Sequence, residues 1–425
     1  MKKLKKIIKW SVIIGLSYFF LTTLYFGYDD IDSEKGIYKF YWSGLNGLWK
    51  KNKPFGFKKD EAVITYLDGT DGPYIYGDTV YLVNQNSQLQ QYQLNGSKNL
   101  MVKTQCSQLP KFSVALRDTM LIEPEHYQMP SKLIAISDIE GNFNGFYSFL
   151  VANKVIDKNG NWIFGTGHLV LNGDFIDRGN QVSQVLWLIY HLENQASAQG
   201  GKVHYILGNH EIMNMYGDVS YNDFKYIAVA QKISKQAHWD KALRRLYAPE
   251  SVLGKWLRSK NIVEKIGDHI FVHGGLNNYH LKGKYAIPEL NAIAKRYYGV
   301  YPTEASVQNE RDRNLISSIN SPFWDRRLNF EWKYKIMFKL NGIDAQATSQ
   351  NELDRILQFY DARRIIIGHS VVDDICTGYN NKVIKIDLKH GQEINSGKTK
   401  GLLIENNILY KVDDLNTKTK LIDGQ

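Results

Sequence analysis

"GDFIDRGN" (173–180) and "GNHE" (208–211) each begin where an apolar run ends. The first motif follows "HLVLN" (168–172), and the second follows "VHYIL" (203–207). Continuous short runs rich in aliphatic residues are typical of strands that are buried on both faces of a sheet. The two motifs therefore predict a covered sheet with polar residues at its strand ends, which is where α/β proteins bind their ligands.

Three more apolar runs end in the same way. "LIAI" (133–136) precedes Ser137-Asp138, "HIFV" (269–272) precedes His273-Gly274, and "RIIIG" (364–368) precedes His369. The stretch "QVSQVLWLIYHLENQ" (181–195) places apolar residues at helical spacing, so helices are expected between the strands. This alternation predicts an α/β fold with buried sheets covered by helices.

The polar residues at these strand ends form one set of potential metal ligands. They are Asp138, Glu140, Asp174, Asn209, His273 and His369. Hard oxygen donors combined with imidazoles suit divalent ions such as Mn, Fe, Zn or Mg. Six ligands exceed one tetrahedral shell, which indicates two ions held about 3.5–4 Å apart by a shared carboxylate. A cation between Asp138 and Glu140 would also remove the repulsion between these two neighbouring acids.

The motifs resemble a known family. "SDIEGN", "GDFIDRGN", "GNHE", "VHGGL" and "GHS" occur in the order found in calcineurin-like metallophosphoesterases of the phosphoprotein phosphatase branch. The resemblance extends from residue 132 to about 412. "SPFWDRR" (321–327) is similar to the P-x-W-x-R element of bacterial Shewanella-like phosphatases. The resemblance implies a four-layer α/β/β/α sandwich with a helical cap insertion at 277–363.

Residue roles follow from the same resemblance. It implies that Asp138, Glu140 and Asp174 hold one ion, and that Asp174 bridges to a second ion held by Asn209, His273 and His369. His210 would be the general acid, oriented by Asp177, and the nucleophile would be a metal-bound hydroxide. Arg178 would bind phosphate, with Asn209 and Arg326 as further substrate contacts and Trp324 as a wall of the pocket.

Glu140 departs from the family pattern, which has His at this position. A carboxylate can still bind a hard ion, and its extra negative charge would shift metal preference towards harder ions. The alternative is that Glu140 faces solvent and the first metal position is weak or empty. Other simple readings also exist: Asp177 and Arg178 as a structural ion pair, and Arg326 as a surface residue. His168, His191, His204 and His238 have no comparable context and are expected to be structural.

The N-terminus predicts a membrane anchor. "MKKLKKIIK" carries five lysines, and residues 10–28 follow without a charge. At ~1.5 Å per residue this stretch is about 28 Å long, close to the thickness of the hydrocarbon core. The lysines on one side and Asp29-Asp30 on the other favour an inner-membrane, single-pass protein with its catalytic domain in the periplasm. The alternative is secretion after cleavage of a signal peptide.

The net charge and the number of cysteines exclude further classes of function. The net charge is +10, but the charge outside the N-terminal lysines is spread without a basic run, so no nucleic-acid partner is expected. The only two cysteines, Cys106 and Cys376, are too few for a structural zinc site and leave open whether a single disulfide forms.

The predicted organisation is a membrane anchor (1–28), a juxtamembrane connector (29–56), a β-rich region (57–128) and a metallophosphoesterase domain (129–415). The predicted function is dinuclear-metal-dependent hydrolysis of phosphomonoesters by a protein-phosphatase-like enzyme, with a phosphoprotein or a small phosphate ester as substrate. Two alternatives remain: hydrolysis of a nucleotide or diadenosine polyphosphate, and a non-catalytic envelope binding protein with a degenerate site. An intact His210, Asp177 and Arg178 argue against degeneration.

Overall fold

The computed structural model describes residues 2–32, 37–49, 55–58, 61–62, 67, 69–120, 122–340, 343 and 345–422. The chain divides into two compact units. One comprises Met1–Tyr66 with Asn222–Ala228, and the other comprises Leu67–Tyr221 with Val229–Gln425. We call the second one the catalytic unit, because it contains every residue of the candidate site described below.

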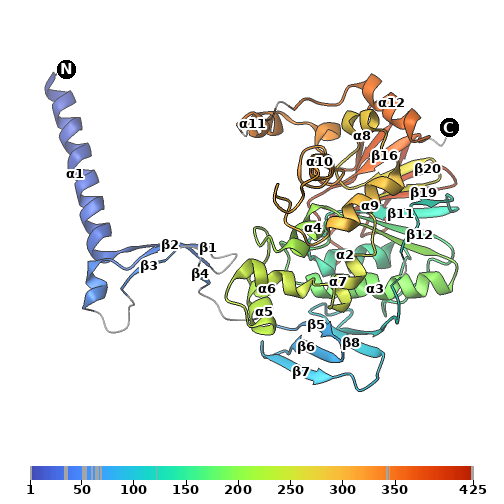
Figure 1. Ribbon diagram of the computed structural model, residues 1–425, viewed down its shortest axis with the longest axis horizontal. Coiled ribbons are helices and arrows are strands. Elements are labelled where there is room, and N and C mark those ends of the chain that lie inside the picture. Colours follow the sequence, from blue (N-terminus) through green and yellow to red (C-terminus); the bar gives the residue numbers. More distant parts are fainter. Residues whose placement is uncertain are drawn as a thin grey trace. The chain divides into compact units, whose positions relative to one another are not determined.

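The first unit is a long helix followed by a small antiparallel sheet (Figure 1). Helix α1 spans Lys2–Phe26, and residues 3–26 are long and apolar enough to cross a membrane, as a membrane span or a signal sequence would be. The elements that follow it are β1 (Tyr28–Asp32), β2 (Ile37–Trp42), the 3₁₀ helix η1 (Leu45–Leu48), β3 (Phe57–Lys58) and β4 (Glu61–Ala62). Strand β2 is central and pairs with the other three.

Two six-stranded sheets form the centre of the catalytic unit. The first has the order β13-β12-β11-β19-β20-β21, and the second has the order β10-β14-β15-β16-β18-β17. The first sheet comprises β11 (Lys132–Ile136), β12 (His168–Asn172), β13 (Lys202–Ile206), β19 (Lys400–Glu405), β20 (Ile408–Asp413) and β21 (Lys418–Ile422). The second comprises β10 (His126–Tyr127), β14 (Val263–Ile266), β15 (His269–Val272), β16 (Arg364–Ile367), β17 (Cys376–Gly378) and β18 (Val383–Lys385).

The two sheets pack face to face. Alternate residues of each strand point into one shared core, such as Leu133 and Ala135 of β11 with Phe271 of β15 and Ile366 of β16. Each fully buried side chain of this kind contributes about 1.5–3 kcal/mol to stability. The residues between them, such as Ile134, are also fully buried, so the outer faces are covered as well. This explains why the strands are continuous apolar runs.

Helices cover both outer faces, which completes the four layers that the sequence predicted (Figure 1). Helices α2 (Phe143–Ala152) and α3 (Val182–Ala198) lie on one side, and α8 (Asn278–Gly283), α9 (Ile287–Tyr297) and α12 (Gln350–Phe359) lie on the other. The remaining helices are α4 (Asn209–Tyr216), α5 (Phe224–Ser234), α6 (Trp239–Leu246), α7 (Val252–Leu257), α10 (Glu310–Ser317), η2 (Arg327–Asn329) and α11 (Trp332–Leu340). In the part of the chain that the structure describes, the insertion at 277–363 is helical and irregular, without strands.

The β-rich leader is attached to α3. It contains β5 (Asp71–Tyr76), β6 (Thr79–Val83) and β7 (Leu89–Gln93) in one sheet and the hairpin of β8 (Asn99–Lys103) and β9 (Lys111–Ala115). The Nε1 of Trp187 donates to the carbonyl of Pro73 (2.8 Å), and the Nε2 of Gln184 donates to that of Thr70 (3.0 Å). The compact unit thus begins at Leu67, inside the predicted region 57–128. Cys106 and Cys376 are both free thiols.

Candidate metal centre

The ends of the two sheets are joined by Asn172, the last residue of β12. Its Nδ2 donates to the carbonyl of Val272 (3.1 Å) on β15 and to that of Ile366 (3.3 Å) on β16. This buried amide therefore ties one strand of the first sheet to two strands of the second. Asp174, His273 and His369, which follow these strands, consequently lie close to one another.

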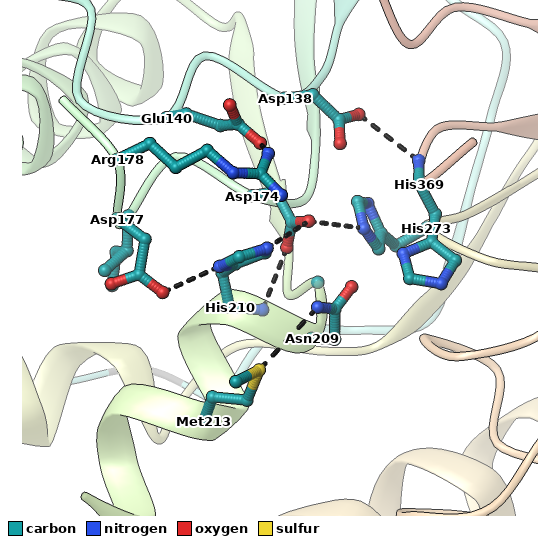
Figure 2. A network of polar contacts seen from close by, with 12 residues as sticks. Asp138, Glu140, Asp174, Asp177, Arg178, Asn209, His210, Met213, His273 and His369 are labelled. Atoms are coloured by element: carbon teal, nitrogen blue, oxygen red, sulfur yellow. Dashed lines mark hydrogen bonds and ion pairs between the residues drawn. The ribbon is translucent and has the colours of Figure 1, made fainter. Parts of the chain in front are cut away.

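Asp174 lies at the centre of the site (Figure 2). Its Oδ2 is 2.9 Å from the Nε2 of His273 and 3.7 Å from the Nε2 of His210, and its Oδ1 accepts from the backbone N–H of His210 (3.0 Å). Burial would raise the pKa of Asp174, but the charges of His273 and His210 outweigh it and lower the pKa. The carboxylate is therefore held in its charged form, which is the form that binds cations.

Asp174, His273 and His369 could together hold a metal ion. One ligand atom from each lies within 4.8 Å of the others, and all three side chains are buried. His273 donates its Nδ1 proton to the carbonyl of Asn172 (2.8 Å), which directs Nε2 towards Asp174. The two carboxylates of Asp174 and Asp138 outweigh burial and raise the pKa of His273 to about 10. The site thus favours a positive charge between Nε2 and Asp174.

Three buried polar atoms at this place lack a hydrogen-bonding partner among the described residues. They are the Oδ1 of Asn209, the Nε2 of His369 and the Nε2 of His273, which makes an ion-pair contact with Asp174 but no hydrogen bond. An unpaired buried polar atom is costly, so such atoms usually face a ligand. The Nδ2 of Asn209 contacts the sulfur of Met213 (3.8 Å), which leaves the amide oxygen for the site. An amide oxygen, two imidazole nitrogens and a carboxylate fit the divalent metal ion that the sequence implies.

Asp138 lies beside this group. The backbone N–H of His369 donates to its Oδ2 (3.3 Å), and its own N–H donates to the carbonyl of Gly173 (2.9 Å). Burial and the charge of Asp174 raise the pKa of Asp138 to about 6, although His273 acts in the opposite direction. Asp138 is therefore a buried carboxylate next to Asp174, and its role as a ligand of the first metal position stays a prediction.

Glu140 is placed differently from the other predicted ligands. Its carboxylate forms an ion pair with the guanidinium of Arg178 (Figure 2), and it is absent from the group of three ligands described above. Its backbone N–H donates to the carbonyl of Asp174 (3.0 Å), so the main chain stays close to the site. Arg178 is half-exposed and also lies over the ring of Tyr221, 5.4 Å from its centroid.

His210 and Asp177 form a buried pair. The Nδ1 of His210 donates to the Oδ2 of Asp177 (2.6 Å), and the Nδ2 of Asn214 donates to the Oδ1 of Asp177 (2.8 Å). Burial would lower the pKa of His210, but Asp174 and Asp177 outweigh it and raise the pKa. The two aspartates therefore favour the protonated imidazole, and Nε2 lies on the side of Asp174.

The backbone of the site is strained. Asp138, Glu140, Asp174, Asp177, Arg178 and His369 all have φ between 49° and 78°. This left-handed region is uncommon for residues other than glycine, and such residues often cluster at functional sites. The strained turns point these side chains towards one place instead of alternating them along a strand.

Glu211 stabilises the strained turn, and the sequence did not suggest this role. Its carboxylate accepts from the backbone N–H groups of Asp174 (3.0 Å), Phe175 (2.7 Å), Ile176 (3.3 Å) and Gly208 (2.8 Å), and from the hydroxyl of Tyr205 (2.9 Å). The backbone of Gly208 packs directly against Asp174. A Cβ at position 208 would be 2.2 Å from the Oδ1 of Asp174, which is too close for a side chain. In the sequence, the signal for this role was the glutamate that ends "GNHE".

The predicted cap residues lie against His369. The Nη1 of Arg326 donates to the carbonyl of His369 (2.5 Å) and to the Oγ of Ser370 (3.1 Å), and its guanidinium stacks on Tyr334. The ring of Trp324 is 5.7 Å from the imidazole of His369, in an edge-on arrangement. Arg326 thus supports the main chain at His369 in this structure.

A pocket of about 620 Å³ opens beside Asp138, Glu140 and Arg178. Asp387 and His390 also line it, and neither was predicted from the sequence. Asp387 is buried, and burial together with the charge of Asp138 raises the pKa of its carboxyl. It follows β18 by two residues, as His369 follows the adjacent parallel strand β16. The apolar run "VIKI" before Asp387 was the signal, weakened by the lysine inside it.

This arrangement of strand-end carboxylates, imidazoles and an amide between two packed sheets defines a metal-dependent phosphoesterase. The model of the calcineurin-like phosphoesterase family matches residues 131–373. The chain belongs to this family. The family depends on divalent metal ions, and the donors described above fit them.

Individual relatives and a solved structure narrow the classification within the family. The chain is 25% identical over 299 residues to Shewanella-like protein phosphatase 2 of Arabidopsis thaliana, covering 62% of this chain and 72% of that one. It is 28% identical over 241 residues to Shewanella-like protein phosphatase 1 of Plasmodium berghei, covering 56% and 61%. Among solved structures, the cold-active protein-tyrosine phosphatase of a psychrophilic Shewanella species matches with a TM-score of 0.70 and 30% identity, over 83% of this chain and 99% of that one. The chain is therefore a phosphatase-like enzyme related to the Shewanella-like protein phosphatases.

Proposed function

We propose that this enzyme uses two divalent metal ions to hydrolyse phosphomonoesters on proteins. The observation that carries the proposal is the set of buried ligand atoms of Asn209, His273 and His369, which make no hydrogen bond and lie around Asp174. Asn209, His273, His369 and Asp174 would hold one ion. Asp138, Glu140 and Asp174 would hold the other, with Glu140 as the least supported ligand because it pairs with Arg178. Bound divalent ions polarise a phosphate ester and lower the pKa of water towards neutrality.

The protein side chains would perform the remaining steps. Arg178 is half-exposed on the pocket and can exchange its ion pair with Glu140 for two hydrogen bonds to phosphate oxygens. His210 would donate its Nε2 proton to the leaving oxygen, because the two aspartates raise its pKa and favour the protonated ring, and Asp177 fixes the opposite nitrogen. Arg326 would act through His369, whose carbonyl it holds, and would contact phosphate only after leaving this position.

We further propose that α1 remains as an uncleaved membrane anchor and that the catalytic unit is exported to the periplasm. The supporting observation is the apolar helix itself, whose residues are exposed along its length. The lysines before it and the two aspartates after it favour this orientation. Residues 129–415 would form the phosphoesterase domain, preceded by the β-rich region.

The function is tested by phosphate release with the purified full chain and Mn²⁺. His210→Ala should lower turnover of phenyl phosphate by about 10²–10⁴ without loss of bound metal. The loss should be smaller for p-nitrophenyl phosphate, since its better leaving group needs less protonation. His126→Ala, an exposed histidine outside the site, is the control. Equal losses for the two esters would exclude His210 as the general acid.

The substrate class is tested on the same preparation. Phosphotyrosine and phosphoserine peptides should be hydrolysed with higher kcat/KM than diadenosine tetraphosphate. A preference for the dinucleotide would replace the proposal with a nucleotide hydrolase. Absence of turnover for every ester, with metal bound, would favour a binding protein.

A further inference from the structure

The small sheet after α1 carries aromatic side chains on one face. Tyr28 of β1 pairs with Trp42 of β2, and Trp42 pairs with Phe57 of β3. Residues directly opposite each other in antiparallel strands point to the same side, and so does Phe40, two residues before Trp42. We call Tyr28, Phe40, Trp42 and Phe57 the aromatic face.

The rings of the aromatic face contact one another but are not covered. Phe40 lies 4.9 Å from Phe57 and 5.6 Å from Tyr28, measured between ring centroids. Tyr28, Phe40 and Phe57 are nevertheless exposed, Phe57 by 61%. Asp30 lies opposite Phe40 and therefore points to the same side, so the face carries one carboxylate beside its aromatic rings. An exposed apolar patch of this kind normally marks an interaction surface.

The sheet is fixed to the end of the helix. A Cβ on Gly44 would lie 2.3 Å from the backbone nitrogen of Gly27, so the two main chains are in direct contact. Gly44 has φ +74° and Gly27 has φ +91°, which other residues rarely adopt. The next segment is closed by Ser43, whose N–H donates to the carbonyl of Gly56 (3.0 Å) and whose Oγ accepts from the N–H of Gly56 (3.0 Å). The sheet therefore has a defined position at the foot of α1.

That position identifies what covers the aromatic face. The face starts at Tyr28, two residues after α1 ends at Phe26, so it continues the exposed apolar surface of the helix. The sheet leaves the foot of the helix sideways (Figure 1), and it would lie along the membrane surface if α1 crossed the bilayer. Tyrosine and tryptophan prefer the membrane–water interface.

We propose that the aromatic face lies in the headgroup region of the lipid bilayer and acts as a platform on the exported side of the membrane. The proposal rests on the anchor proposed for α1 and goes beyond it. A bare transmembrane helix can rotate and tilt freely, whereas a helix with a sheet fixed across its end has a second contact with the bilayer. The platform would thereby restrict the orientation of the chain where it leaves the membrane.

The experiment uses tryptophan reporters in the full chain, reconstituted in phosphatidylcholine vesicles brominated near the glycerol end of the acyl chains. Phe57→Trp places a reporter on the aromatic face, and Phe359→Trp places a matched reporter at an exposed position of α12. The emission of each added tryptophan is obtained by subtracting the unmodified chain. Trp10→Phe gives the emission of Trp10 within α1 in the same way.

We expect brominated lipid to quench the added emission of Phe57→Trp at least twofold and to leave that of Phe359→Trp unchanged. Aqueous iodide should give the reverse pattern. If iodide quenches Phe57→Trp and brominated lipid does not, the face is in water and the proposal is wrong. If neither quenches it, protein covers the face, and the proposal is equally wrong. If the Trp10 emission is not quenched by lipid, the anchor itself fails, and the platform fails with it, whatever the phosphatase activity.

Discussion

The carboxylate of Glu140 forms an ion pair with the guanidinium of Arg178 across the entrance of the metal centre (Figure 2). One residue is a predicted metal ligand, and the other is the predicted phosphate contact. In the structure, each of these two side chains is therefore engaged by the other. A metal ion bound by Glu140 would release Arg178 from the ion pair, and a phosphate bound by Arg178 would release Glu140. Each binding event would therefore favour the other.

Glu140→Ala tests whether this carboxylate binds metal. We expect the metal content to fall from about two ions to about one per chain, because Asp138 and Asp174 alone would form a weak first position. Elemental analysis after dialysis against trace Mn²⁺ measures this directly. An unchanged metal content would restrict Glu140 to its ion pair with Arg178.

Arg178→Ala should raise the KM for phosphate esters by about 10–100-fold, since charge-assisted hydrogen bonds contribute about 1.5–3 kcal/mol. The number of bound metal ions should not fall, because Arg178 is not a metal ligand and its loss frees Glu140. Arg245→Ala is a matched control, because Arg245 is similarly exposed and pairs with Glu250 on the surface. Steady-state kinetics compare the two variants, and equal KM values would remove Arg178 from the substrate site.

Glu211→Gln should weaken both the fold and the metal centre. The amide of glutamine would turn an N–H group towards backbone N–H donors that now bond to the carboxylate. Leaving these buried donors unpaired would cost about 1–3 kcal/mol of stability. Metal affinity should fall about 10–100-fold, as is typical when groups that support ligands are lost. Urea unfolding and metal titration measure the two effects. Glu310→Gln, on the exposed start of α10, serves as the control. Normal metal affinity in Glu211→Gln would limit Glu211 to folding.

A buried ion-pair cluster away from the site should make stability pH-dependent. Glu123 pairs with Lys260 (3.0 Å) and with Lys202. Burial would raise the pKa of Glu123, but the two lysines outweigh it and lower the pKa from 4.5 to about 2. A lowered folded-state pKa stabilises the protein above pH 4.5, and this contribution disappears as the pH falls from 4.5 to about 2.

Glu123→Gln should therefore lower the free energy of unfolding by about 3 kcal/mol at pH 7 and have little effect near pH 2. Urea unfolding at both pH values, followed through the transition of the catalytic unit, measures this change in the free energy of unfolding. Glu250→Gln, from an exposed ion pair, should change stability by less than about 1 kcal/mol at either pH. Equal effects of Glu123→Gln at the two pH values would contradict the assignment.

The strands of the core were predictable because they are uninterrupted apolar runs. "HLVLN" coincides with β12, and "HIFV" coincides with β15. Residues that follow such strands could be predicted to meet, since the ends of neighbouring strands lie at one edge of a sheet. Asp387 escaped prediction because the lysine at 385 interrupts its strand, although the strand pairs in parallel with β16.

The amino-acid pattern was enough to predict the family and the α/β layers, because hydrophobic periodicity and motif spacing are local properties of the chain. It also supplied the candidate donors of the proposed metal centre. The partner of each donor depends on contacts between residues far apart in sequence. Examples are the pairing of Glu140 with Arg178, the support of three chain segments by Glu211, and the tie between the sheets at Asn172. These contacts depend on turns with positive φ and on the packing of the two sheets, and local sequence carries no direct record of either.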